Sequence, residues 1–215
     1  MASFMNEFGA PNFSRAGEST LVLDCGDRAD AQPHLWSLAR TARSWAHVRE
    51  AVVGAGTLSL LFDRNRIGYD ALCERLEHAF LAADDDAETP RVVEIPVQYD
   101  GEDLAAVAHA CGLRCDEVIA LHAGGAYVVA FVGFLPGFAY LDGLPERLQI
   151  PRRSQPRTRV PAGSVAIAGA QSGIYPFDSP GGWHIIGRTG TRMFDPQRTP
   201  AALAQPGDRV RFVIQ

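Results

Sequence analysis

Two kinds of hydrophobic spacing follow one another over the first 90 residues. Short β-rich runs are separated by longer segments that repeat apolar side chains at helical spacing. In chain order, the predicted strands and helices cover residues 20–25, 29–45, 48–53, 57–62 and 69–82. The order strand, helix, strand, strand, helix is typical of a small α+β layer with helices on one face of an antiparallel sheet. We therefore expect an α+β domain over residues 18–90, preceded by a flexible leader over residues 1–17.

Two local features bear on this first domain. Gly54 and Gly56 lie between two predicted strands and lack the third glycine of a dinucleotide-binding loop, so they indicate a plain turn. The acidic segment 83–90 ends in proline and is typical of a linker. We place the domain boundary in this segment.

The spacing changes in the second half of the chain. The predicted elements are first a strand, two short helices and a strand, at residues 91–99, 102–111, 116–122 and 126–134. Residues 133–190 then contain 10 glycines and 7 prolines, with large apolar side chains distributed among them. Many short strands joined by glycine- and proline-containing turns are typical of a β-barrel. We expect an all-β barrel domain over residues 91–215.

Every one of the 20 basic residues is arginine, and the chain contains no lysine. This excludes a Schiff-base or pyridoxal-phosphate lysine, a Walker-type phosphate loop, a kinase-type lysine and a biotin-carrying lysine on this polypeptide. Codon bias is sufficient to explain the absence, but the chemical consequence is the same. With a formal net charge of −5 and no basic run interleaved with aromatic residues, the chain is not expected to bind nucleic acid.

Expectations about compartment and metal binding follow from what the sequence lacks. No apolar run approaches the roughly 20 residues of a membrane helix, and the N-terminal stretch lacks the charged start and apolar core of a signal peptide. We therefore expect a cytoplasmic protein without a membrane partner. The four cysteines contain no CxxC pair, and His109, Cys111 and Cys115 have no second ligand pair nearby, so we expect reduced thiols and no metal site.

Four arginines within eight residues are the most concentrated chemical feature of the glycine-rich segment. They are Arg152, Arg153, Arg157 and Arg159. Their planar guanidinium groups suit a carboxylate or a phosphate, which predicts an anion-binding pocket among the turns. The competing interpretation is structural, because arginines near turns often cap carbonyl groups or pair with acids such as Glu146 and Asp178. The residue types alone leave both interpretations open.

Further polar groups in the same segment are candidates to contact a ligand. They are Gln171, Tyr175, Ser179, Trp183 and the backbone amides of Gly181 and Gly182. Among the nearby histidines, His122 precedes the strand that leads into the segment and is the better general-base candidate. The chain contains no GxSxG elbow, no HExxH motif and no carboxylate spacing that identifies an acid/base pair. It therefore lacks the signature of a self-sufficient enzyme.

The same segment resembles that of a known family. Its three runs are GFLPGFAYLDGLPERLQIPRR, PRTRVPAGSVAIAG and GIYPFDSPGGWHIIGRT. This composite motif closely resembles the signature of the Kip-inhibitor/allophanate-hydrolase-subunit-1 family, most strongly over residues 122–190. The resemblance implies a cyclophilin-like fold for the barrel. It does not imply prolyl-isomerase activity, since that active-site pattern is not visible here.

The resemblance also implies an activity that is shared with partners. The family's best-defined enzymatic members act in bacterial 5-oxoprolinase, where they work with an A and a C subunit in the ATP-dependent opening of 5-oxo-L-proline to L-glutamate. For this chain, that implies a hydrolase subunit that is inactive alone, with ATP bound mainly by a partner. His122 and Tyr175 would be the catalytic candidates. The remaining candidates would bind the substrate, namely Arg152, Arg153, Arg157, Gln171, Ser179, Gly181, Gly182 and Trp183.

Two alternative functions remain within the family. One member inhibits a sporulation histidine kinase by binding it, which would make this chain a regulatory binding protein. Related domains in urea carboxylase and allophanate hydrolase belong to carboxyltransferases. In that case another polypeptide would have to carry the biotin, because this chain has no lysine.

Overall fold

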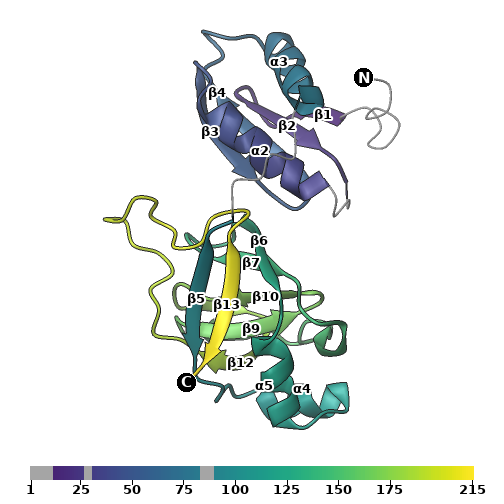
Figure 1. Cartoon of the computed structure of the whole chain (residues 1–215). Coiled ribbons are helices and arrows are strands. Elements are labelled where there is room, and N and C mark those ends of the chain that lie inside the picture. The colour runs from purple at the N-terminus through teal and green to yellow at the C-terminus, as the bar shows by residue number, and fades with distance from the viewer. Residues whose placement is uncertain (1–11, 27–30, 83–89) are drawn as a thin grey trace. The chain divides into compact units, whose positions relative to one another are not determined.

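The chain folds into two compact units, Met1–Thr89 and Pro90–Gln215 (Figure 1). The computed structural model describes residues 12–26, 31–82 and 90–215. The division between the units falls at the end of the acidic segment 83–90. None of the helices in the three described ranges has the length and hydrophobicity needed to cross a membrane.

In the first unit, two helices pack on a four-stranded antiparallel sheet. Its elements are β1 (Asn12–Arg15), β2 (Thr20–Asp24), α2 (Ala31–Arg43), β3 (Val48–Val53), β4 (Thr57–Phe62) and α3 (Tyr69–Ala82). The strands lie in the order β1-β2-β4-β3. Apart from β1, this is the predicted succession of strand, helix, strand, strand and helix.

One face of this sheet forms the core of the first unit. Leu21, Leu23, Leu58 and Leu60 alternate along β2 and β4 and are fully buried. The helices α2 and α3 contact these strands, whereas Leu61 on the opposite face is exposed. Because side chains alternate between the two faces of a strand, both helices cover the same face, as predicted.

The strand β1 corrects part of the predicted leader. Residues 1–11 lie outside the described residues, but Asn12–Arg15 pair antiparallel with β2. Three of the four side chains of β1 are exposed. An edge strand held by backbone hydrogen bonds needs no strong hydrophobic pattern, so its residues carry little sign of a strand.

The segment 54–56 is the plain turn that its position predicts. The Gly54 N–H donates to the Thr57 carbonyl (2.8 Å), and the Gln32 side chain bonds both the Gly54 carbonyl and the Gly56 N–H. Gly56 has a φ of 61°, and a Cβ there would lie 1.9 Å from the carbonyl oxygen of Gly26. Glycine is therefore required at position 56 by the close approach of two backbone segments.

The second unit is a nearly closed, mixed β-sheet with helices attached to it. Its elements are β5 (Val92–Val97), α4 (Leu104–Cys111), α5 (Cys115–Ala123), β6 (Tyr127–Val132), β7 (Ala139–Asp142), the short 3₁₀ helix η1 (Glu146–Leu148), β8 (Arg157–Val160), β9 (Ser164–Ala168), β10 (Gln171–Ile174), β11 (Ser179–Gly181), β12 (His184–Arg188) and β13 (Arg209–Ile214). The main sheet has the order β12-β9-β10-β7-β6-β13-β5, and β8 and β11 form a separate ribbon.

Backbone hydrogen bonds bring the two edges of this sheet together. Gln98, which follows β5, exchanges hydrogen bonds of 2.9 and 2.8 Å with Arg188 at the end of β12. The sheet therefore curls into a barrel-like form, as expected. The unit is not all-β, however, because it includes α4 and α5, at the places where two short helices were expected. The sheet is mixed because β13 and β5 run parallel.

Two hydrophobic clusters lie on opposite faces of the barrel strands. Along β9, Val165 and Ile167 belong to the interior cluster, whereas Ala166 and Ala168 belong to a second cluster with Trp183. All five residues of β9 are buried, so both faces of this strand are covered. We call the second cluster, together with the β8–β11 ribbon and residues 149–157, the outer layer.

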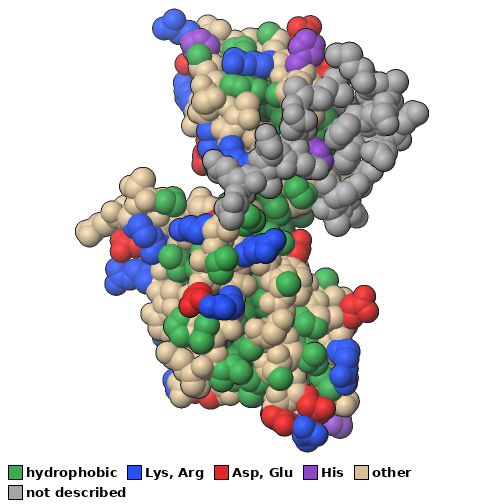
Figure 2. All heavy atoms as spheres, viewed as in Figure 1, with side chains coloured by type: hydrophobic (Ala, Val, Ile, Leu, Met, Phe, Trp, Pro, Cys, Tyr) green, Lys and Arg blue, Asp and Glu red, His purple; other side chains and the backbone are tan. Residues whose placement is uncertain are grey.

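Acidic and basic side chains of the second unit lie beside one another at several places on the face drawn in Figure 2. Among the ion pairs on the barrel surface are Arg211 with Glu94 and Arg188 with Asp100. These arginines are therefore paired rather than gathered into one basic surface. Exposed pairs of this kind contribute little stability individually.

Candidate functional site

Arg153 and Arg157, two of the predicted anion-binding residues, are held by one buried carboxylate. Arg153 Nη1 lies 2.8 Å from Asp103 Oδ1, and Arg157 donates to both Asp103 oxygens at 2.8 and 2.9 Å. Only 5% of the Asp103 side chain is exposed, and Arg157 Nε also lies 2.8 Å from Glu102. The two arginines thus pair with an internal acid, as in the structural interpretation that the residue types left open, and their contact with a ligand stays a prediction.

The Asp103 carboxylate also connects α4 to β12. It accepts a hydrogen bond from the Ile185 N–H (2.7 Å), while the Asp103 N–H donates to the Ile185 carbonyl (3.0 Å). Burial alone would raise the pKa of Asp103. The hydrogen bonds from Arg157 and Ile185, with the charge of Arg153, outweigh burial and hold this pKa below its ordinary value. The carboxylate is therefore ionised at neutral pH, as its two guanidinium partners require.

Arg159 follows the structural interpretation as well. Its Nε donates to Asp178 Oδ2 (2.8 Å), and the other oxygen of Asp178 accepts from the Ala162 N–H (2.8 Å). Both side chains are exposed. The pair joins the turn between β8 and β9 to the segment before β11, which is the pairing with Asp178 that the sequence left open.

Arg152 differs from the other three arginines of the segment. Its side chain is exposed, and no acidic partner lies within ion-pair distance of it in the part of the chain that the structure describes. The guanidinium carbon lies 5.8 Å from the centroid of the Trp183 ring, within range of a cation–π interaction. Of the predicted anion contacts among the arginines, Arg152 is therefore the one without an acidic partner in the described residues.

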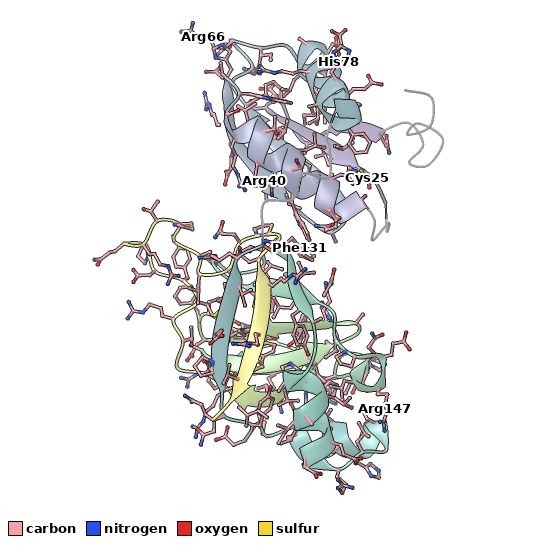
Figure 3. All side chains as sticks on the ribbon, in the orientation of Figure 1. Cys25, Arg40, Arg66, His78, Phe131 and Arg147 are labelled. Carbon is pink, nitrogen blue, oxygen red and sulfur yellow. The ribbon has the colours of Figure 1, made fainter. Side chains whose placement is uncertain are left out.

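The ring of Trp183 belongs to an aromatic cluster in the outer layer. Its other members are Phe131, Phe134, Phe138, Tyr140 and Tyr175. Phe131, labelled in Figure 3, stacks on Tyr140 with ring centroids 4.3 Å apart. Tyr140 in turn meets Trp183 edge to face at 5.8 Å. Pairs in this geometry fix the orientation of the rings beyond what burial alone does.

Tyr175, a predicted catalytic residue, is packed within this cluster. It is only 2% exposed, and a Cβ on Gly181 would lie 2.3 Å from its hydroxyl oxygen. Burial raises the pKa of Tyr175, although a hydrogen bond from the Trp183 N–H acts in the opposite direction. The structure thus gives Tyr175 and Gly181 a shared packing role, since only a glycine allows the ribbon to approach the phenol so closely.

The remaining predicted contacts lie in or beside the β8–β11 ribbon and on β10. Ser179 is buried, and its hydroxyl has no hydrogen-bond partner among the described residues. The Gly182 carbonyl accepts a hydrogen bond from the Arg153 N–H (2.9 Å). Gln171 donates to Asp142 Oδ1 (2.9 Å) at the start of β10. Gln171 is half-buried, so its side chain, like that of Arg152, keeps some exposure to solvent.

His122 lies inside the barrel rather than beside the outer layer. It is fully buried, with Nδ1 2.8 Å from the Tyr99 hydroxyl and Nε2 2.8 Å from the Ser172 hydroxyl. Burial lowers the pKa of His122 to about 3, so the imidazole is neutral at physiological pH. Both ring nitrogens are paired with side-chain hydroxyls, which is the arrangement of a structural histidine, and its role as a proton carrier stays a prediction.

Two residues that sequence reasoning missed are central to this arrangement. Asp103 lies 50 residues before Arg153, and nothing in the sequence connects them. Tyr140 lies between Ala139 and Leu141, which belong to the interior cluster. The alternation of faces along a strand therefore contained the signal that Tyr140 points outward.

The loop that begins at Gly133 has an unusual backbone. Phe134 has a φ of 67°, a left-handed conformation that is rare for an aromatic residue, and its side chain is 60% exposed. Its ring meets Phe138 edge to face at 5.5 Å. A neighbouring loop supports this one, because a Cβ on Gly137 would lie 2.8 Å from the Phe194 side chain.

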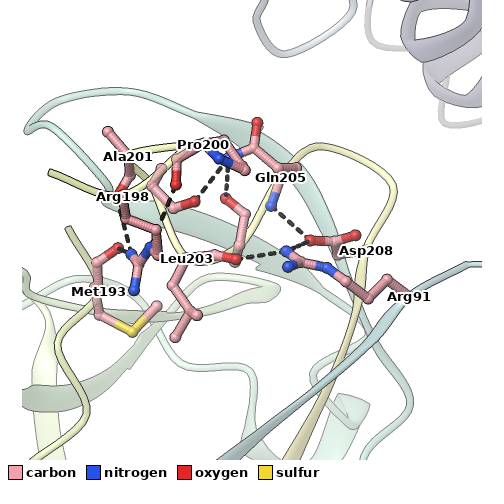
Figure 4. Close-up of polar contacts among 10 residues, drawn as sticks. Arg91, Met193, Arg198, Pro200, Ala201, Leu203, Gln205 and Asp208 are labelled. Atoms are coloured by element: carbon pink, nitrogen blue, oxygen red, sulfur yellow. Dashed lines mark hydrogen bonds and ion pairs between the residues drawn. The ribbon is translucent and has the colours of Figure 1, made fainter. Parts of the chain in front are cut away.

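Arginine side chains hold that neighbouring loop in place (Figure 4). Arg198 donates to the carbonyls of Met193, Pro200 and Ala201 at 3.2, 3.3 and 2.8 Å. Arg91 pairs with Asp208 and bonds the Leu203 carbonyl. Five donors on one rigid fork allow an arginine to satisfy several carbonyls of an irregular segment. Here arginine replaces the hydrogen bonds of regular secondary structure.

Comparison with known proteins defines the family. Residues 11–204 match the model described as "Carboxyltransferase domain, subdomain C and D". The chain therefore belongs to this carboxyltransferase-domain family, which is of the Kip-inhibitor/allophanate-hydrolase-subunit-1 type.

Its curated relatives have a common name. The chain is 42% identical to the B subunit of 5-oxoprolinase from Escherichia coli O157:H7, over 93% of this chain and 94% of the relative. It is also 42% identical to the B subunit of 5-oxoprolinase from Haemophilus influenzae, over 95% of this chain and 98% of the relative. These names describe one component of a multi-subunit assembly.

Solved structures agree with this placement. The crystal structure of TTHA0988 is 39% identical with a TM-score of 0.80, and the match covers 96% of this chain and 40% of the TTHA0988 chain. The chain thus spans two fifths of the length of that solved protein. The urea amidolyase of K. lactis matches 95% of this chain and 15% of its own length, with a TM-score of 0.73 and 17% identity, which shows a common fold.

Proposed function

We propose that this chain is the B component of a 5-oxoprolinase, which opens 5-oxo-L-proline to L-glutamate. The observation that carries the proposal is the 42% identity to two curated relatives of that name over nearly the full length of both partners. The match extends over both units of the chain rather than over the barrel alone.

The proposal includes partners and ATP. We infer that the chain acts with an A and a C subunit and is inactive alone, and that most of the contacts to ATP come from a partner. The sequence supports this division, because it contains no Walker-type loop and no lysine to contact a triphosphate. Lactam opening needs activation of the ring carbonyl, which phosphorylation by ATP would supply, followed by stabilisation of the developing negative charge.

In this proposal, the chain contributes to binding of the substrate. 5-Oxoproline carries one carboxylate and a lactam N–H and C=O, so it offers few charged groups for an enzyme to hold. The outer layer has an arginine without an acidic partner among the described residues, beside aromatic rings. Such a combination suits a small, planar, anionic molecule.

Reconstitution tests the proposed function. The purified chain is mixed with the A and C proteins encoded beside it, ATP and 5-oxoproline, and glutamate is measured over time. We expect glutamate to form only when all three proteins and ATP are present. Equal glutamate formation without this chain would contradict the proposal, and so would no glutamate from the full mixture.

A further inference from the structure

The backbone on both sides of Arg152 is fixed, although its side chain is exposed. The Ile150 carbonyl accepts from the Gly169 N–H (2.7 Å), the Pro151 carbonyl accepts from His184 Nε2 (2.9 Å), and the Arg153 N–H donates to the Gly182 carbonyl (2.9 Å). These three contacts tie residues 150–153 to the β9–β10 turn and to the segment around β12. The guanidinium of Arg152 is thus presented from a rigid support.

The surface beneath Arg152 is also rigid. The Trp183 ring is 4% exposed and is held edge to face by Phe138 and Tyr140, at 5.6 and 5.8 Å. A guanidinium placed over a fixed ring loses little further conformational entropy when it binds an anion, because its position is already restricted. Its N–H donors remain available in the plane of the guanidinium, since none of them is directed to an acid among the described residues.

Tyr140, which meets the same Trp183 ring, supplies a second donor. Its side chain is half-buried, and no hydrogen bond of its hydroxyl exists within the described part of the chain. Burial raises the pKa of Tyr140, while the nearby positive charge of Arg152 acts in the opposite direction. The hydroxyl is therefore protonated at neutral pH and can donate a hydrogen bond. Arg152 and Tyr140 thus both contact the Trp183 ring, the first as a charged donor and the second as a neutral one.

The other arginines of the segment, unlike Arg152, have acidic partners. Arg153 and Arg157 share Asp103, and Arg159 has Asp178. These three arginines near turns are thus paired with acids, whereas Arg152 lies on an aromatic ring. The missing counter-charge at Arg152 is what an anionic ligand would provide.

We propose that Arg152 and the Tyr140 hydroxyl bind the carboxylate of the substrate at the edge of the aromatic cluster, over the Trp183 ring. This inference rests on the proposed function, which makes 5-oxoproline the carboxylate-bearing substrate. The two donors position the substrate and take no part in bond breaking. Their removal therefore weakens binding and leaves the chemical step largely unchanged.

The test uses the reconstituted complex with Arg152→Gln, which removes the charge, and Tyr140→Phe, which removes only the hydroxyl. We expect Arg152→Gln to raise KM for 5-oxoproline by about 10- to 100-fold and Tyr140→Phe by about 3- to 10-fold, with kcat within about twofold. Arg152→Lys keeps the charge, so its KM for 5-oxoproline is expected to lie between those of wild type and Arg152→Gln. Arg159→Gln is the matched control and leaves KM unchanged, because Arg159 is occupied by Asp178.

A lactam without a carboxylate separates substrate contact from indirect effects. 2-Pyrrolidinone is used as a competitive inhibitor, and its inhibition constant is expected to be the same for the wild-type and Arg152→Gln complexes. A KM for 5-oxoproline within twofold of wild type in Arg152→Gln would overturn the carboxylate site, and so would an equal loss of 2-pyrrolidinone binding. If the wild-type complex forms no glutamate, the proposed function itself fails and the inference fails with it.

Discussion

The interior of the barrel and the outer layer are built on opposite faces of the same strands, and each contains polar groups that sequence reasoning placed at one site. Inside, His122 is enclosed between the Tyr99 and Ser172 hydroxyls. In the outer layer, Arg153 and Arg157 are paired with Asp103 at the start of α4, whereas Arg152 remains without an acid among the described residues. Burial and the presence of hydrogen-bond or ion-pair partners, rather than residue type, therefore distinguish structural polar groups from those that can bind a ligand.

The largest effect is expected from removal of Asp103, the acid that pairs with two arginines of the outer layer. We expect Asp103→Asn to lower the free energy of unfolding by about 3–5 kcal/mol, because it leaves Arg153 and Arg157 without their shared charge. Chemical denaturation measures the loss. Asp178→Asn, which removes an exposed partner of Arg159, is the control and should have little effect. Equal effects of the two substitutions would show that the Asp103 network is not a structural one.

Acid titration probes the interior. An unfolded histidine has a pKa of about 6.5, whereas burial lowers that of His122 to about 3. Between these values the unfolded chain binds a proton that the folded chain does not, so stability falls as the pH falls below 6.5. The slope approaches about 1.4 kcal/mol per pH unit.

Substitution isolates this histidine from other groups that titrate in acid, including Asp103. We expect His122→Gln to make the difference in unfolding free energy between pH 7 and pH 4.5 smaller than in the wild-type chain. The exposed His109 provides the control, and His109→Gln should keep the wild-type slope. If His122→Gln leaves the slope of unfolding free energy against pH unchanged, His122 takes up protons in the folded chain. It could then carry a proton in the reaction.

Gly181 and Gly182 are adjacent in the ribbon but differ in the space around them. A Cβ on Gly181 would lie 2.3 Å from the Tyr175 hydroxyl, whereas on Gly182 it would make an ordinary contact of 3.6 Å with Pro156. Gly181→Ala should therefore cost about 1–3 kcal/mol of stability, and Gly182→Ala less than about 0.5 kcal/mol. Thermal unfolding of the two variants measures this. Similar losses would contradict the packing role of Gly181.

Local patterns in the sequence predicted most elements up to residue 134 individually and the later strands only as a group, but few of the partnerships. The strands and helices follow from residue spacing, and the turn at 54–56 follows from its two glycines. The edge strand β1 lacks a hydrophobic pattern and was missed. The long-range pairing of Asp103 with Arg153 and Arg157 depends on how the barrel closes, which no local spacing encodes. For the same reason the sequence singled out four arginines but could not separate Arg152 from the others.

Arg152 and Arg153 offer the most direct test, because they are adjacent, of one residue type, and assigned opposite roles. KM for 5-oxoproline in the reconstituted complex and the unfolding free energy of the chain are measured for Arg152→Gln and Arg153→Gln. We expect a raised KM with unchanged stability for Arg152→Gln, and lowered stability with unchanged KM for Arg153→Gln. A raised KM in Arg153→Gln with none in Arg152→Gln would contradict it.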